Sequence, residues 1–188
     1  FFNTPARFKF QKGRSTEMSH IIDIVSRFIM GRPDISFRLI SDNEETLRSL
    51  GTGKLIDAIA SVYGLDMARS MVEVKAQRED MNVRGYVTQP VISKSDRYAE
   101  TFFVNGRYVR NMLLSKALED AFRNLIPFGK YPISVLMIDV DPKDIDVNVH
   151  PTKREVKFAR ADSVIRLINS AVSASLSGIS RSQEYASP

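Results

Sequence analysis

The stretch DIDVNVHPTKREVKF, from Asp144 to Phe158, combines residue types that could bind a phosphate. Apolar and polar residues alternate up to His150, which predicts a β-strand with one apolar face. Pro151 has no backbone N–H to donate, so regular strand pairing should end there. Lys153 follows on a stiff turn, and its ammonium group is a compact charge suited to one phosphate oxygen. From the residues alone, an ordinary surface loop is the simpler interpretation.

Two arginines, Arg107 and Arg110, belong to a second segment that could contact phosphates. They follow Asn105-Gly106, which supplies the two positive-φ residues of a tight type I′ hairpin turn. Arginines on a projecting hairpin are suited to the phosphate backbone of a nucleic acid. A charged hairpin that keeps an edge strand from pairing is the alternative interpretation.

Other patterns do not support a catalytic or metal site within the chain. The GTGK stretch at 51–54 is not a P-loop, because Arg48 and Leu55 stand where the motif needs a glycine and a Ser or Thr. No nucleophile-elbow motif or calcium-binding loop is present. The paired carboxylates are interpreted as a polar strand edge beside an Asp-Pro turn: Asp139, Asp141, Asp144 and Asp146.

The composition limits the class of protein. The chain has 188 residues, enough for one domain, or for one domain and part of another. It has no cysteine and two histidines, which excludes a disulfide scaffold and argues against a histidine-rich metal centre. The net charge of +5 favours polyanionic partners such as nucleic acid or nucleotide. No segment resembles a membrane helix or a signal peptide.

The elements that must position these residues follow from periodicity and capping signals. Helices are predicted at 15–30, 54–64, 112–126 and 163–176. Strands are predicted at 35–41, 71–77, 81–89, 133–140 and 144–150, with a hairpin over 100–111. This order predicts an α+β fold with helices packed on one face of a mixed sheet.

The predicted elements divide the chain into three parts. Residues 1–50 hold one helix and one strand, which cannot bury their apolar faces alone, so we interpret them as the end of a domain whose larger part is missing. Residues 51–180 form the α+β domain. Residues 181–188 are predicted to be a flexible tail.

Three motifs in a fixed order, FFNTPAR, FFVNGRYVRN and DVNVHPTKREVKF, resemble the MutL family of DNA mismatch-repair proteins. The resemblance runs from Phe1 to about Ser177. It implies that 1–50 is the end of an N-terminal GHKL ATPase domain. It also implies that 51–180 is a ribosomal-protein-like second domain of the GHKL transducer type, with a left-handed βαβ crossover.

The resemblance assigns a role to the opening stretch. Lys153 would contact the γ-phosphate of ATP bound in the GHKL domain, and Asn148, His150 and Pro151 would support its loop. ATP and Mg²⁺ would be cofactors of the full-length ATPase, whose catalytic glutamate lies outside this chain. The chain alone is therefore predicted to lack ATPase activity and to bind no cofactor tightly.

The partners implied by the resemblance are the GHKL domain of the same chain, DNA bound without sequence preference, a MutS-type mismatch recognition protein and a second copy in an ATP-dependent dimer. Relatives place further basic residues where the hairpin enters its helix, but here Asn111 and Met112 stand there. DNA contact is therefore assigned to Arg107 and Arg110. A prokaryotic protein of this kind would be cytoplasmic and nucleoid-associated. A stand-alone nucleic-acid-binding module and a purely structural interaction domain are the alternative hypotheses.

Overall fold

The computed structural model describes residues 14–146 and 155–184. The chain divides into two compact units, one ending at Val62 and the other beginning at Tyr63, and each is described by itself. The boundary expected from the sequence, between residues 50 and 51, precedes helix α3, and the compact units divide near the end of that helix.

The first unit consists of two helices and a β-hairpin: α2 (Arg14–Gly31), β1 (Arg38–Ser41), β2 (Glu44–Arg48) and α3 (Leu55–Tyr63). The two predicted helices are confirmed. The predicted strand begins only at Arg38, and β2 was not predicted. β1 and β2 pair antiparallel through a turn at Asp42 and Asn43, which both have positive φ. Such a turn matches the twist of a two-stranded hairpin.

Helix α2 leaves part of its apolar surface exposed. Ile29 and Met30 are buried, whereas Ile21, Ile24 and Phe28 are exposed. The ring of Phe28 stacks on that of Phe37 with a centroid distance of 6.4 Å. An apolar group that stays in water contributes nothing to folding, so this face is available to a further part of the protein.

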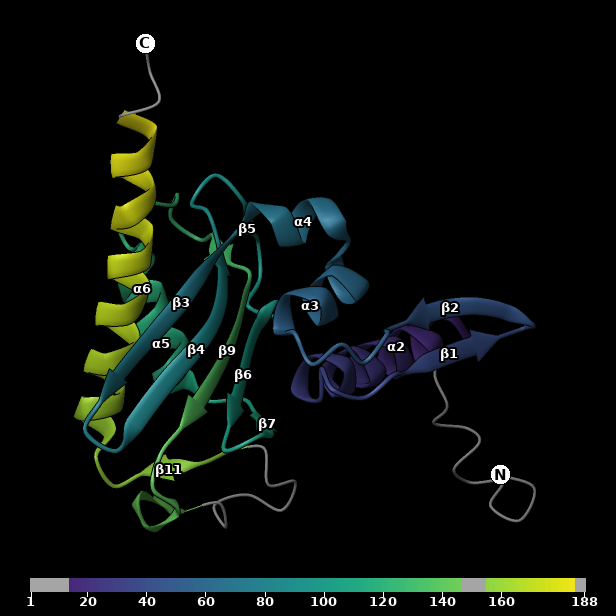
Figure 1. The fold of residues 1–188 in the computed structure, drawn as a ribbon, viewed down its shortest axis with the longest axis horizontal. Coiled ribbons are helices and arrows are strands. Elements are labelled where there is room, and N and C mark those ends of the chain that lie inside the picture. The colour runs from purple at the N-terminus through teal and green to yellow at the C-terminus, as the bar shows by residue number, and fades with distance from the viewer. Residues whose placement is uncertain (1–13, 147–154, 185–188) are drawn as a thin grey trace. The chain divides into compact units, whose positions relative to one another are not determined.

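The second unit is built on a five-stranded sheet with the order β3-β4-β9-β6-β7 (Figure 1). Its strands are β3 (Met71–Arg78), β4 (Met81–Thr88), β6 (Glu100–Val104), β7 (Arg107–Val109) and β9 (Ser134–Asp139). All neighbours pair antiparallel except β6 and β9, which are parallel. The apolar run at 133–140 predicted a central strand, and β9 lies at the middle of the sheet with almost all of its residues buried.

Two helices, α5 (Met112–Phe122) and α6 (Ala161–Glu184), pack against each other, and α6 also contacts β3 and β4. The predicted α+β fold with helices on one face of a mixed sheet is confirmed (Figure 1). The core between the layers includes Val83, Phe102, Leu118, Phe122, Leu136 and Ile168, each at most 1 % exposed. Helix α6 runs through Glu184, so it includes the first four residues of the segment 181–188 that the sequence predicts to be a flexible tail.

Short elements complete the second unit. Helix α4 (Leu65–Ser70) was not predicted, nor was the ladder of β5 (Ser93–Lys94) with β8 (Tyr131–Pro132). After β9 the chain forms the 3₁₀ turn η1 (Pro142–Asp144) and β10 (Ile145–Asp146), and β11 (Lys157–Phe158) precedes α6. Within the described residues, no helix is both long enough and apolar enough to span a membrane.

Gly85 sets the distance between two central strands. It lies in β4 opposite Leu136 of β9 and has a φ of 151°. A Cβ atom at this position would stand 2.0 Å from the Val135 carbonyl oxygen. Only glycine therefore allows the two backbones to approach this closely.

Candidate functional site

The connection between β10 and β11 carries the predicted phosphate-binding residues. Asn148, His150, Pro151 and Lys153 all lie outside the described residues, but the two flanks of the connection are described. Strands β10 and β11 pair antiparallel, with Ile145 opposite Phe158 and Asp146 opposite Lys157. The Ala159 amide also donates to the Asp144 carbonyl oxygen at 2.8 Å. The two described flanks of the connection are therefore held side by side.

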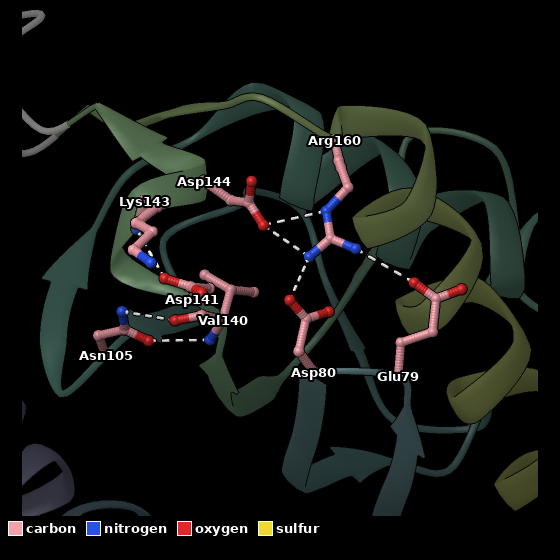
Figure 2. Close-up of polar contacts among 8 residues, drawn as sticks. All are labelled: Glu79, Asp80, Asn105, Val140, Asp141, Lys143, Asp144 and Arg160. Carbon is pink, nitrogen blue, oxygen red and sulfur yellow. Dashed lines mark hydrogen bonds and ion pairs between the residues drawn. The ribbon is translucent and has the colours of Figure 1, made fainter.

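The two paired flanks, Asp144–Asp146 and Lys157–Ala159, form what we call the base of the connection. Arg160 joins this base to the central sheet (Figure 2). Its Nε donates to Asp144 Oδ2 at 3.0 Å, and its Nη1 donates to Glu79 Oε2 at 3.1 Å. Its Nη2 contacts both Asp144 and Asp80. Asp144 precedes β10, Arg160 follows β11, and Glu79 and Asp80 form the turn between β3 and β4. One guanidinium thus holds both flanks of the connection against a hairpin of the main sheet.

Within this network, hydrogen bonding shifts the pKa values of Arg160 and Asp80. Hydrogen bonding to Arg160 lowers the pKa of Asp80, and hydrogen bonding to Asp80 and Asp144 raises the pKa of Arg160. Arg160 and Asp80 therefore each favour the charged form of the other.

Asn105, at the tip of the β6–β7 hairpin, holds the chain where it leaves β9 (Figure 2). Its Nδ2 donates to the Val140 carbonyl at 3.0 Å, and its Oδ1 accepts from the Val140 amide at 2.9 Å. The positive φ at Asn105 and Gly106 confirms the predicted type of turn. Asp141 then caps η1 by accepting from the Lys143 amide at 2.9 Å. The start of the flank is fixed by side-chain to backbone bonds.

Asn111 holds the chain on the other side of the connection. Its Oδ1 accepts from the amides of Leu113 at 2.9 Å and Leu114 at 3.3 Å, which caps the N-terminus of α5. Its Nδ2 donates to the Val156 carbonyl at 2.7 Å. Asn111 therefore joins the start of α5 to the flank that precedes β11.

The two candidate DNA-binding residues lie near the sheet edge formed by β7. Arg107 is exposed at the start of this strand, and Arg110 is exposed between it and α5. The Nε of Arg110 donates to the Tyr108 hydroxyl at 3.1 Å, and its Cζ lies 5.7 Å from the centroid of the Tyr98 ring. Both arginines are therefore exposed at the β7 end of this hairpin, and Arg110 lies against the Tyr98 ring.

A cavity of about 310 Å³ lies beside Arg110 and contains a buried acid. Glu100, the first residue of β6, is only 6 % exposed, and among the described residues neither of its carboxylate oxygens has a hydrogen-bond partner. Burial raises the pKa of Glu100 to about 7. The nearby Ser115 hydroxyl and Arg97 guanidinium favour the charged form, but they do not offset burial. Sequence reasoning did not single out this glutamate.

Carboxylates that the sequence places along a strand edge have partners in the structure. Asp139 lies 3.9 Å from Arg84, Asp141 caps a turn and Asp144 pairs with Arg160. Among the described residues, no group of three His, Asp or Glu side chains is arranged to hold a metal ion. The interpretation of Asp141 as a turn residue is confirmed, whereas Asp144 is an ion-pair partner and not a solvated edge residue.

Comparison of the fold with solved structures shows the class of protein in which this fold occurs. In comparison with solved structures, the chain superposes over its full length on 61 % of the N-terminal domain of a DNA repair protein, with a TM-score of 0.78 and 22 % identity. It also superposes over 92 % of its length on 58 % of the Aquifex aeolicus MutL ATPase domain, with a TM-score of 0.63 and 20 % identity. The fold is the one found in the N-terminal part of such DNA-repair proteins.

The sequence comparisons identify the family. Residues 59–177 match the family described as "DNA mismatch repair protein, C-terminal domain". The chain is 44 % identical over 176 residues to MutL of Streptococcus pneumoniae strain CGSP14 and to HexB of S. pneumoniae strain TIGR4. The chain therefore belongs to the DNA mismatch repair family and is of the MutL type. The aligned part covers 94 % of this chain and 27 % of the length of these relatives.

Proposed function

We propose that this chain is the part of a MutL-type repair protein that distinguishes ATP from ADP. Lys153 contacts the γ-phosphate of ATP bound by the GHKL domain, and Asn148, His150 and Pro151 support its loop. Because ADP lacks this phosphate, the contact favours the closed arrangement of the two domains only when ATP is bound. The Lys153 charge can also offset negative charge on the phosphate being cleaved.

The observation that carries this proposal is the anchored base of the connection. Its flanks are paired through Ile145 and Phe158 and held by Arg160. A charge that is delivered on a segment with fixed ends loses less conformational freedom on binding than one on an open tail. This is the arrangement expected for a residue that must meet a phosphate on another domain.

The exposed apolar face of α2 supports the domain assignment. Ile21, Ile24 and Phe28 are exposed, which is unusual for a helix that also buries Ile29 and Met30. We propose that the rest of a GHKL domain covers this face in the full-length protein, and that ATP and Mg²⁺ bind there. Residues 1–50 are then the last part of that domain, and the present chain alone hydrolyses no ATP.

The test is Lys153→Ala in the full-length protein. We expect ATP turnover to fall about tenfold or more, because one charge near the transferred phosphate is lost. The affinity for a non-hydrolysable ATP analogue should fall towards that for ADP. Lys75→Ala is the matched control, since Lys75 is exposed in β3 and loses the same charge. Unchanged turnover in Lys153→Ala, or an equal loss in both variants, would contradict the proposal.

DNA contact is a second proposed function of the same domain. Arg107 and Arg110 are exposed near one sheet edge, and the chain carries a net charge of +5. We expect Arg107→Gln and Arg110→Gln each to weaken DNA binding for all sequences and to reduce the slope of log affinity against log salt by about one. Arg69→Gln, in α4, is the control because its side chain is also exposed. Equal effects of all three variants would remove the assignment to this hairpin.

The alternative hypotheses predict other results. A stand-alone nucleic-acid-binding module binds DNA equally with and without ATP and the GHKL domain, whereas a structural interaction domain binds neither ligand. In the full-length protein, we propose an ATP-dependent dimer that works with a MutS-type protein on DNA, in the cytoplasm if the source is prokaryotic. Binding to DNA that depends on both ATP and the GHKL domain favours this proposal over the other two.

A further inference from the structure

We propose that Arg160 is a positioning residue for the ATP response, which it controls by fixing the base of the connection between β10 and β11. The proposal rests on the function proposed above for Lys153. Arg160 itself lies between β11 and α6 and is assigned no contact with the nucleotide. Its action is on the two flanks, which the structure describes (Figure 2).

The ladder at the base is too short to hold its register alone. It consists of Ile145 opposite Phe158 and Asp146 opposite Lys157, with one further bond from Ala159 to Asp144. A two-stranded ladder of this size is marginal in water. Bonds from outside the ladder are therefore needed to keep its two strands in place.

Arg160 supplies such bonds in a geometry that a smaller cation could not reproduce. Nε and Nη2 both donate to Asp144, while Nη1 and Nη2 reach Glu79 and Asp80 on the β3–β4 turn. The planar guanidinium thus serves three carboxylates in fixed directions, whereas a lysine ammonium would serve them without that preorganisation. The flank before β10 and the flank after β11 are joined to each other and to the sheet.

The contribution of this network is to local order more than to global stability. The Arg160, Glu79 and Asp80 side chains are 36 %, 61 % and 44 % exposed. Ion pairs with this exposure add little to the stability of a whole domain. Losing Arg160 should therefore loosen the base while the core between the sheet and α6 stays folded.

The experiment compares nucleotide discrimination in four forms of the full-length protein: wild type, Arg160→Gln, Lys153→Ala and the double variant. The readout is the ratio of the affinities for a non-hydrolysable ATP analogue and for ADP. We expect Arg160→Gln to lower this ratio about five- to tenfold, since small displacements of a charged group have large effects at a reacting phosphate. In the Lys153→Ala background, Arg160→Gln should cause no further change, because both act through one contact.

Two measurements separate positioning from a general loss of structure. Hydrogen exchange of the full-length protein should be faster for the Ala159 amide in Arg160→Gln and unchanged in β9. Arg123→Gln is the matched control, since Arg123 pairs with Asp120 at the end of α5 and loses the same kind of interaction. If Arg160→Gln does not fold, Asp144→Asn removes the link across the base and leaves Arg160 with Asp80, and it should lower the ratio in the same direction.

The outcomes distinguish this proposal from the one it rests on. If Lys153→Ala leaves the ratio unchanged, the proposed function fails and Arg160 has nothing to position. If Lys153→Ala lowers the ratio but Arg160→Gln and Asp144→Asn do not, only the positioning role is overturned. A further loss in the double variant shows that Arg160 acts by another route, which also overturns it.

Discussion

Replacing Glu100 by glutamine should stabilise the chain above neutral pH and leave its stability unchanged in mild acid. Glu100 is 6 % exposed, its carboxylate oxygens have no hydrogen-bond partner in the part of the chain that the structure describes, and burial raises its pKa from 4.5 to about 7. Below about pH 4.5, the pKa of Glu100 in the unfolded chain, its carboxyl group is neutral in both the folded and the unfolded state. Glutamine has nearly the same shape and cannot ionise, so Glu100→Gln isolates the cost of burying the charge.

The sign and size follow from proton linkage. Between about pH 4.5 and 7 the folded state holds a proton on Glu100 that the unfolded state releases, so this group lowers stability as pH rises through that window. A difference of about 2.5 pKa units corresponds to about 3 kcal/mol once both states are ionised. The stability advantage of Glu100→Gln should therefore grow from near zero at about pH 4.5 to about 3 kcal/mol above pH 7.

Urea unfolding at several pH values checks this prediction. The chain has no tryptophan, so far-UV circular dichroism or tyrosine fluorescence would report the transition. Glu73→Gln is the control, because Glu73 is exposed in β3 and its replacement should give only a small difference in stability. An advantage of Glu100→Gln that is constant with pH, or a variant less stable than wild type above pH 7, would refute the argument from burial.

Two further predictions concern backbone contacts. Gly85→Ala should cost about 3 kcal/mol or more, since its Cβ would meet the Val135 oxygen at 2.0 Å and its φ of 151° suits only glycine. Gly178→Ala, in open space on α6, should stabilise instead, and equal effects in urea unfolding would contradict this reasoning. Asn111→Ala should cost about 2 kcal/mol through the lost cap and the unpaired Val156 carbonyl. Asn111→Asp keeps the oxygen that caps α5 but loses the N–H that donates to the Val156 carbonyl, so it should be destabilised less than Asn111→Ala. If Asn111→Asp is as stable as wild type, the bond to Val156 contributes nothing.

The elements predicted correctly from the sequence are those whose local signal agrees with their tertiary environment. Helix α5 and strand β9 have clear periodicity or a continuous apolar run, and Asn105-Gly106 specifies a turn by its backbone preference. Strand β2 was missed because most of its residues are exposed, so no apolar alternation marks it. Helix α4 was missed because six residues after Gly64 are too few to show a helical period.

The candidate site was predictable only where a motif is local. The resemblance to MutL proteins, now confirmed, led to Lys153 through one continuous stretch. Arg160 gave no such signal, because its partners Asp80 and Asp144 are 80 and 16 residues away. Glu100 likewise begins an apolar strand, and the cavity that contains it is lined by Arg97 and by Ser115 of α5. Long-range pairing of charges and burial of single polar groups are properties of the folded chain, which a local pattern does not record.

The motif FFVNGRYVRN is hydrogen-bonded to the chain on both sides of the connection within the motif DVNVHPTKREVKF. Asn105 at the hairpin turn bonds the backbone of Val140, and Asn111 at the hairpin exit bonds the backbone of Val156. Val140 and Val156 lie on either side of the connection that carries Lys153, and both are buried. The hairpin motif therefore fixes both flanks of the second motif, and Arg160 closes the base between them. Under the function proposed for Lys153, Asn105→Ala and Asn111→Ala in the full-length protein should each lower the ratio of the affinities for a non-hydrolysable ATP analogue and for ADP, and an unchanged ratio in both would contradict this link.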